Sequence, residues 1–163
     1  MNAAVRASKN EPPPSVDLED LPGHHIRRLH QIAVAIFLHE AEAQGVTPVQ
    51  YAALQAVANA PGIDQRTLAR TIGLDTSTTG GVVDRLESRG LLLRNANPDD
   101  RRVRLLTITD DGRALLKAAV PAMLRAQQRI LEPLPPAERD EFMRMLRVLV
   151  VANNAASRAP SEV

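Results

Sequence analysis

The 163-residue sequence predicts a mainly α-helical chain with one small β-hairpin, which is an α+β arrangement. Three observations support this class. Two short helices are expected on either side of a tight turn between residues 64 and 90. A hairpin pattern follows directly, with turn-forming residues at 97–100. Longer segments with apolar residues at helical spacing flank this central region on both sides.

The composition indicates packed helices. Only Phe37, Tyr51 and Phe142 are aromatic, so the core must consist mainly of aliphatic side chains. The absence of cysteine excludes disulfides and thiol chemistry. The net charge of +1 does not by itself indicate a polyanionic partner. No apolar run approaches the roughly 20 residues of a membrane helix, and residues 1–15 lack the apolar core of a secretory signal. We therefore expect a cytoplasmic protein with no membrane partner.

The distribution of prolines and apolar residues divides the chain. Residues 1–20 contain three successive prolines among small and charged residues, and we expect a disordered tail there. Residues 21–163 are expected to form a single domain. Its expected parts are a central lobe at 47–113 and outer helical segments at 21–46 and 114–156.

The first two helices follow from apolar spacing and capping residues. A helix is expected over residues 24–44, ended by Gly45, with an apolar stripe at Ile26, Leu29, Ala33, Ile36 and Phe37. Thr47 should cap the next helix, and Gln50 stands where a capping box needs it. Pro61 and the glycine after it should stop this second helix.

The next two helices are separated by only a few residues. Asp64 should cap a helix that Gly73 closes, because glycine suits the left-handed position after a helix. Asp75 or Thr76 should cap the following helix, which is expected to end near Arg89. This order is typical of a helix-turn-helix.

The remaining elements are a hairpin and two long helices. Strands are expected at 91–95 and 102–108, so the helix-turn-helix carries a β-hairpin wing. Thr109 should cap a helix over 110–131, in which Pro121 should cause a kink or an interruption. A last amphipathic helix is expected from 136 to about 154.

Four small hydroxyl residues open the second helix of the helix-turn-helix: Thr76, Ser77, Thr78 and Thr79. Such residues are poor choices in a helix interior, but at a helix N-terminus in a DNA major groove they can reach base edges and phosphates. Arg85 lies two turns further on and is expected to contact phosphate. The alternative for Arg85 is an ion pair with Asp84 or Glu87.

Basic residues are concentrated in the hairpin, at Arg94, Arg101, Arg102 and Arg104. One arginine near the tip can enter the minor groove of DNA, and the others would bind phosphate. Asp100 is expected to orient one of these guanidinium groups. The alternative is a solvated hairpin with no partner.

A cationic cluster at the start of the first helix suggests an anion pocket. His24, His25, Arg28 and His30 lie within about one turn and a half of helix, and Tyr51 on the next helix offers a hydroxyl group. Together they could hold a small aromatic carboxylate between apolar walls. The alternative is that they lie at a dimer interface or in solvent. The spacing of the histidines does not support a metal site, and we expect no metal and no cofactor.

Two motifs resemble the MarR family of transcriptional regulators. The segment VVDRLESRGL at residues 82–91 resembles the end of that family's recognition helix. Asp100, Arg101 and Arg102, followed by Leu106-Thr107 and then Gly112, resemble its wing and the helix that follows. Leu105 departs from the pattern, because many members carry a basic residue there. The resemblance places Thr76 to Thr79 on base-reading positions, and Asp100 and Arg102 on the wing Asp and Arg.

The resemblance implies a homodimer that is joined by the outer helices and binds a pseudo-palindromic operator in double-stranded DNA. Members are usually repressors, released by a small phenolic or aromatic acid bound between the dimerisation helices and the DNA-binding lobe. The lack of cysteine excludes the peroxide-sensing branch. The histidine- and arginine-rich opening of the first helix is similar to members that control nicotinate breakdown and sense a hydroxylated pyridine carboxylate.

Other functions remain as alternatives. The same fold could dock on a protein rather than on DNA, or respond to a metal. Catalysis is not expected, because the sequence has no Ser/His/acid arrangement and no phosphate-binding glycine loop.

Overall fold

The computed structural model describes residues 15–100 and 102–157. The α-helices in these ranges are α1 (Pro22–Glu40), α2 (Pro48–Asn59), α3 (Gln65–Thr71), α4 (Thr76–Ser88), α5 (Asp110–Leu131) and α6 (Pro136–Ala152). The strands are β1 (Ile63–Asp64), β2 (Leu92–Ala96) and β3 (Arg104–Ile108), and the 3₁₀ helices are η1 (Leu18–Asp20), η2 (Glu42–Gln44) and η3 (Asn154–Ala156). The mainly α class with a small β element is therefore confirmed.

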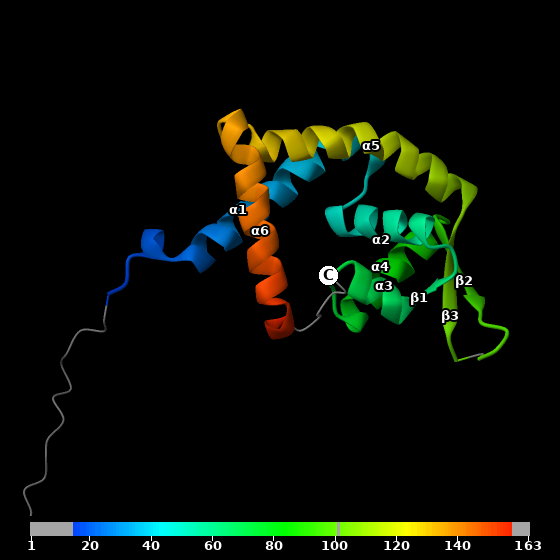
Figure 1. Cartoon of the computed structure of the whole chain (residues 1–163). Helices are drawn as coiled ribbons and strands as arrows, with labels where there is room; N and C mark the ends of the chain where they lie inside the picture. The colour runs from blue at the N-terminus through cyan, green and yellow to red at the C-terminus, as the bar shows by residue number, and fades with distance from the viewer. Residues whose placement is uncertain (1–14, 101, 158–163) are drawn as a thin grey trace, which may run out of the picture.

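Two groups of elements are visible in Figure 1. Helices α2, α3 and α4 form a lobe with the three strands, whereas α5 runs along this lobe and α6 turns back from the far end of α5. The core of the lobe is aliphatic: Leu54, Val57, Leu68, Val82, Val83, Leu86, Leu92, Leu106 and Ile108. A second core joins α1 to α5 through Phe37, Ala41, Val46, Ala119, Ala122 and Ala126. Tyr51 packs against both cores and so lies at their boundary.

The sheet is antiparallel, with strand order β1-β3-β2. In the hairpin, Leu92 lies opposite Ile108 and Arg94 opposite Leu106. The first strand was not predicted. It pairs Asp64 with Leu105, and this pairing places the start of α3 beside the wing.

Local capping follows the sequence closely. Thr47 and Gln50 form the expected capping box, with N···O distances of 3.0 and 3.2 Å. Asp64 accepts the backbone N–H groups of the first turn of α3, and Thr109 accepts that of Gly112 at 3.0 Å. These predictions are confirmed because each depends on residues only a few positions apart.

Three boundaries differ from expectation. The predicted helix over 24–44 is divided, because α1 ends at Glu40 and the short η2 follows. The end of the expected disordered tail is ordered: Asp17 caps η1, while residues 1–14 lie outside the described part of the chain. Pro121 does not interrupt α5, although Figure 1 shows that the helix bends along its length.

Helix α6 buries none of its residues within one chain. Large apolar side chains of α6 and of the neighbouring helices are exposed: Ile26, Ile32, Leu124, Met145, Val148, Leu149 and Val151. Between α1, α5 and α6 lies an apolar groove of about 320 Å³, which Leu29, Phe142 and Leu146 help to line. Exposed apolar area of this extent is typical of an interaction surface. No helix in the described residues is long and apolar enough to cross a bilayer.

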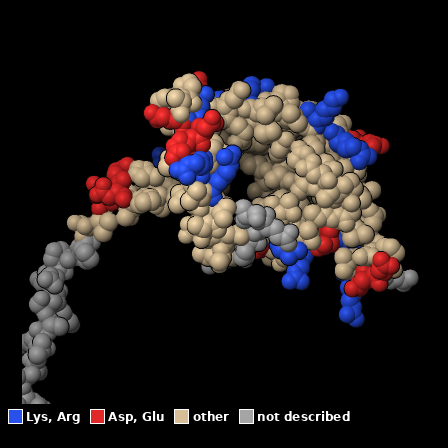
Figure 2. All heavy atoms as spheres, in the orientation of Figure 1, with Lys and Arg blue, Asp and Glu red and all other residues tan. Residues whose placement is uncertain are grey.

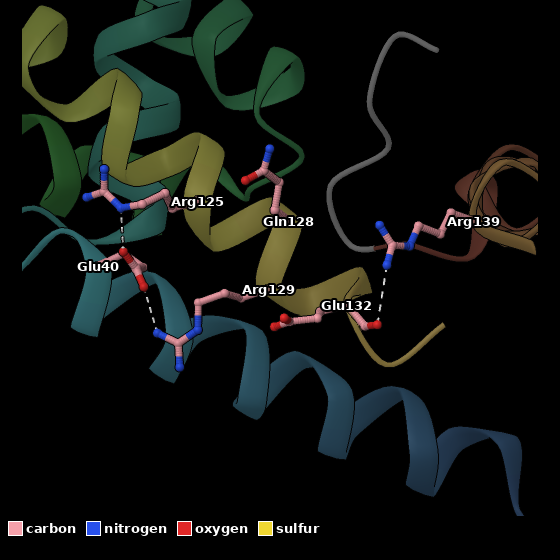
Figure 3. A pocket seen from close by; sticks show the side chains of 6 residues that line it. All are labelled: Glu40, Arg125, Gln128, Arg129, Glu132 and Arg139. Atoms are coloured by element: carbon pink, nitrogen blue, oxygen red, sulfur yellow. Dashed lines mark hydrogen bonds and ion pairs between the residues drawn. The ribbon is translucent and has the colours of Figure 1, made fainter. Parts of the chain in front are cut away.

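Ion pairs connect α1 to α5. Figure 3 shows the Glu40 carboxylate between two arginines of α5, with Arg125 Nε at 2.8 Å and Arg129 Nη1 at 2.6 Å. Hydrogen bonds from the two guanidinium groups hold the pKa of Glu40 below its usual range. Glu40 thus fastens the end of α1 to the middle of α5.

A further contact connects α4 to the segment after α1. Arg89, at the C-terminal end of α4, donates to the carbonyl oxygen of Gly45 at 2.8 Å and approaches that of Gln44 at 3.5 Å. Gly45 has φ +58°, and it lies two residues before Thr47, the cap of α2. The end of α4 is therefore held against the junction between α1 and α2.

Candidate nucleic-acid interface

The N-terminus of α4 presents exposed hydroxyl groups on a well-capped helix. Asp75 accepts the backbone N–H of Thr78 at 2.8 Å and its hydroxyl at 2.6 Å. The hydroxyl bond, followed by the backbone bond, lowers the pKa of Asp75. Because Thr78 gives its proton to Asp75, only the lone pairs of its oxygen remain for another partner. Thr76 and Ser77 are exposed and form no side-chain hydrogen bond with another described residue.

Thr79 does not belong to this exposed surface at the N-terminus of α4. Its side chain is fully buried, and its hydroxyl donates to the backbone carbonyl of Asp75 at 2.9 Å. The expectation that Thr79 reaches DNA together with its three neighbours is therefore corrected. Helical periodicity is the reason, because Thr79, Val82, Val83 and Leu86 share the inward face of α4.

Arg94 also takes a different place from the one expected. Its Nη1 lies 2.6 Å from Glu87 Oε2, and its Nη2 lies 2.6 Å from Asp84 Oδ1. Partial burial lowers the pKa of Arg94, but the bonds to these two carboxylates outweigh that effect and raise it. Arg94 thus fastens β2 to α4, and both ends of its guanidinium group are paired with carboxylates. Arg85 has no ion pair with another described residue, so its predicted phosphate contact stays a prediction.

A hydrogen bond between a side chain and the backbone holds the turn at the wing tip. The Asp100 carboxylate accepts the backbone N–H of Arg102 at 2.9 Å, so it fixes the turn, whereas the sequence suggested that it orients a guanidinium group. Arg102 and Arg104 are exposed and unpaired among the described residues, and Arg101 lies outside them. Figure 2 shows acidic and basic side chains next to one another at this end of the molecule.

One basic residue near the wing was missed in the sequence. Arg66 in the first turn of α3 is exposed, and the pairing of β1 with β3 brings it to the wing. A cleft of about 500 Å³ is lined by Asp64, Gln65, Arg66, Arg102, Val103 and Arg104. The sequence contains little indication that Arg66 lies beside the wing. Strand β1 has only two residues, and its partner strand β3 lies about 40 positions later in the chain.

The proposed effector residues do not meet in one chain. His24 and Phe37 are both on α1, about 20 Å apart along the helix axis. The Tyr51 ring packs against Phe37 with centroids 6.0 Å apart, which places Tyr51 far from the N-terminus of α1. His25 Nε2 instead lies 2.7 Å from the carbonyl oxygen of Glu19. The single pocket expected from His24, His25, Arg28, His30 and Tyr51 is thus absent within the described part of one chain. His30 lines the apolar groove between α1, α5 and α6.

The described residues contain no group of three or more His, Asp or Glu side chains that could hold a metal ion. The anchored α4 with its exposed N-terminus and the arginine-bearing hairpin together define a winged helix-turn-helix protein of the DNA-binding class.

Comparisons with known proteins identify the family. A MarR family profile matches residues 46–103. The transcriptional regulator HosA of Escherichia coli O111:H- is 33% identical over 129 residues, which cover 79% of this chain and 94% of HosA. The transcriptional repressor NicR of Pseudomonas putida is 29% identical over 156 residues, which cover 91% of this chain and 99% of NicR. The chain belongs to the MarR family of transcriptional regulators.

Two solved structures extend the comparison. Bordetella bronchiseptica BpsR, described as regulated in DNA binding by 6-hydroxynicotinic acid, has a TM-score of 0.77 and 32% identity, covering 83% of this chain and 97% of BpsR. The repressor CouR bound to a 23-mer DNA duplex has a TM-score of 0.76 and 33% identity, covering 82% of this chain and 94% of CouR. The winged-helix fold is shared with both.

Proposed function

We propose that this regulator is a cytoplasmic homodimer that represses transcription and leaves its operator when a small aromatic acid binds. The observation that carries the DNA-binding part is the start of α4. Thr76 and Ser77 are exposed there on a helix whose opposite face is anchored in the core by Val82, Val83 and Leu86. A rigid helix with exposed hydroxyl groups at its N-terminus can be inserted into a major groove and read base edges.

The dimer is supported by the surface of α6. This helix leaves Met145, Val148 and Leu149 about half exposed, next to the apolar groove between α1, α5 and α6. A second copy would cover this area. Two copies of α4 related by a two-fold axis would then match an inverted repeat in DNA.

The effector class is supported by relatives and by one residue. BpsR, whose DNA binding is described as regulated by 6-hydroxynicotinic acid, suggests a hydroxylated aromatic carboxylate. Tyr51 packs against both cores, so a ligand bound beside it would touch the lobe and the outer helices. Burial raises the pKa of the Tyr51 hydroxyl, so this group stays protonated and can donate to a carboxylate. Its bond to Gln55 Oε1 is long, at 3.4 Å.

A gel-shift experiment tests the DNA-binding part of the proposal. The wild-type protein should bind the DNA upstream of its own gene more tightly than random DNA of equal length. Ser77→Ala should reduce this preference, and Arg102→Ala should weaken binding to both DNAs. Lys117→Ala, at an exposed position on α5, is the control. Equal affinity of the wild type for both DNAs would contradict the proposal.

A thermal-shift screen tests the effector part. Aromatic carboxylates, 6-hydroxynicotinate among them, should raise the melting temperature of the wild type, and those that do so should release the promoter DNA. Tyr51→Phe, which keeps the ring packing, should need a higher acid concentration. If every acid that stabilises the wild type stabilises Tyr51→Phe equally, Tyr51 has no role in binding.

A further inference from the structure

The cleft between α3 and the wing has two walls that are fixed to each other. Asp64 is both the last residue of β1 and the cap of α3. Its pairing with Leu105 in β3 therefore ties the first turn of α3 to the wing strand. Arg66 projects from one wall, and Arg102 and Arg104 belong to the other.

The charges of this cleft are unbalanced. None of its three arginines forms an ion pair or a side-chain hydrogen bond within the described ranges. The one carboxylate that lines the cleft, Asp64, already accepts the N–H groups of Arg66 and Thr67 at 2.9 and 3.0 Å and the Thr67 hydroxyl at 2.6 Å. Three guanidinium groups around one cavity repel one another, and an anion would relieve this repulsion.

The cleft also adjoins the helix that reads DNA. Gln65 lines it, and a Cβ atom at Gly80 in α4 would lie 3.2 Å from Gln65 Nε2. An anion in the cleft would thus lie next to the early turns of α4. Guanidinium groups suit phosphate oxygens because they donate in a planar fork.

We propose that this cleft binds one backbone phosphate of the operator DNA, held by Arg66 from α3 together with Arg102 and Arg104 from the wing. The inference rests on the proposed DNA-binding function and adds Arg66 of α3 to the phosphate contacts expected from the wing arginines. It also assigns Arg66 a role in affinity, without a role in sequence choice, because a phosphate carries no sequence information.

The test measures DNA affinity of the full chain by fluorescence anisotropy over a salt series, on the promoter fragment and on random DNA. Loss of one phosphate contact lowers the slope of log affinity against log salt by about 0.9, which is about 1.8 for a dimer. Because Arg102 and Arg104 remain in place, Arg66→Gln should lower the slope on both DNAs by up to about this amount. Arg66→Lys should retain most of the slope. Lys117→Gln removes an exposed charge on α5, outside the cleft, and should leave the slope unchanged.

The outcomes separate this inference from the proposed function. If the wild type prefers its promoter but Arg66→Gln keeps the wild-type slope, the phosphate site is wrong and the regulator function stands. If the slope falls but no sequence preference exists, the site stands and the proposed function fails. Absence of any DNA binding overturns both.

A second arm distinguishes DNA phosphate from a free anion. Inorganic phosphate is compared with chloride at equal ionic strength in thermal unfolding without DNA. No Arg66-dependent stabilisation is expected, because one phosphate ion lacks the flanking contacts of a duplex. Stabilisation of the wild type but not of Arg66→Gln, with an unchanged DNA salt slope, would show a free-anion site and overturn the proposal. Circular dichroism should show that Arg66→Gln folds, since Arg66 is exposed and unpaired.

Discussion

Gly112 shows how one residue can fix the junction between the wing and α5. It lies buried in the first turn of α5, where its N–H bonds to the cap Thr109. A Cβ atom at this position would overlap the carbonyl oxygen of Leu91 and lie 2.7 Å from Cγ1 of Ile108. The backbone oxygen cannot move without disturbing the sheet, so only glycine fits.

Gly112→Ala is therefore expected to lower the free energy of unfolding by about 1–3 kcal/mol, the usual range for overpacking. Urea unfolding followed by circular dichroism measures this change. Gly81→Ala is the matched control, because a Cβ atom at Gly81 would meet no atom within 4 Å. Replacing a helical glycine by alanine there should raise stability by about 1 kcal/mol. Equal effects of the two substitutions would contradict the argument from close contact.

At the residue scale, the sequence was informative wherever a role depends on near neighbours. The caps at Thr47, Asp64 and Thr109 could be predicted, because a cap acts over three positions. The burial of Thr79 was missed because a run of four hydroxyl residues was treated as one surface. The pairing of Arg94 was missed because its two partners lie seven and ten positions away in a different element.

At the scale of elements, Arg94 links the wing to α4. Its side chain is 21% exposed and bridges Asp84 and Glu87. Arg94→Gln should destabilise the protein by about 1 kcal/mol, a value limited by the exposure of the carboxylates. DNA affinity should also fall, because two carboxylates are uncovered beside the interface.

The salt dependence of DNA binding checks this role of Arg94. If Arg94 is only a structural bridge, the salt slope of Arg94→Gln should stay close to that of the wild type. If Arg94 contacts a phosphate, loss of that contact should lower the slope by about 0.9 for each subunit. A slope lowered by this amount would support the phosphate contact first expected from the sequence. Arg144→Gln is a control, since that arginine is paired within α6 at 2.6 Å.

Glu40 makes the contact between α1 and α5 sensitive to acid. Its pKa is lowered in the folded state, so the stability it contributes is present above its ordinary pKa of 4.5 and is lost as the pH falls through the lower folded value. Thermal unfolding from pH 7 downward should thus show a smaller acid-dependent loss for Glu40→Gln than for the wild type. Glu138→Gln, an exposed position in α6, should behave as the wild type does. Parallel pH curves for the wild type and Glu40→Gln would contradict the prediction.

The order of the helices and the wing along the chain could be predicted from the sequence. The contacts between elements that are distant in the chain could not. Helical spacing and turn residues gave six helices and a hairpin close to their observed bounds. Strand β1 could not be predicted from the sequence. Two residues are too few to show an alternation of apolar and polar side chains, and the strand is stabilised by its pairing with β3. The cleft at Arg66 was missed for the same reason.

At the scale of the whole molecule, the exposed face of α6 predicts assembly. Leu149→Glu should place a charge in the subunit contact and shift the protein toward the monomer, with weaker binding to the promoter. Sedimentation velocity measures the mass directly. Arg147→Gln lies on the opposite side of α6 and should leave the mass unchanged. If Leu149→Glu keeps the wild-type mass, this face is not the contact.

The position of the proposed effector pocket was the least predictable feature. The histidines and arginines of α1 are neighbours in sequence, but the length of α1 separates them from Tyr51 within one chain. Composition can suggest an anion site, but it does not show whether the N-terminal end of α1 faces Tyr51. That arrangement depends on how the helices pack, within one chain and between subunits.

The contact of Arg89 with Gly45 has a thermodynamic consequence. It holds the end of α4 to the junction after α1, so a ligand that displaces this junction should also disturb α4, the helix proposed to read DNA. Coupling between two binding sites is reciprocal, and operator DNA must therefore weaken the binding of such a ligand by the same factor. Calorimetric titration of 6-hydroxynicotinate with and without operator should show this loss, and equal affinities would contradict it. Each occupied operator would then compete with the proposed inducer, so the acid concentration needed for release should increase with the affinity of the protein for that operator.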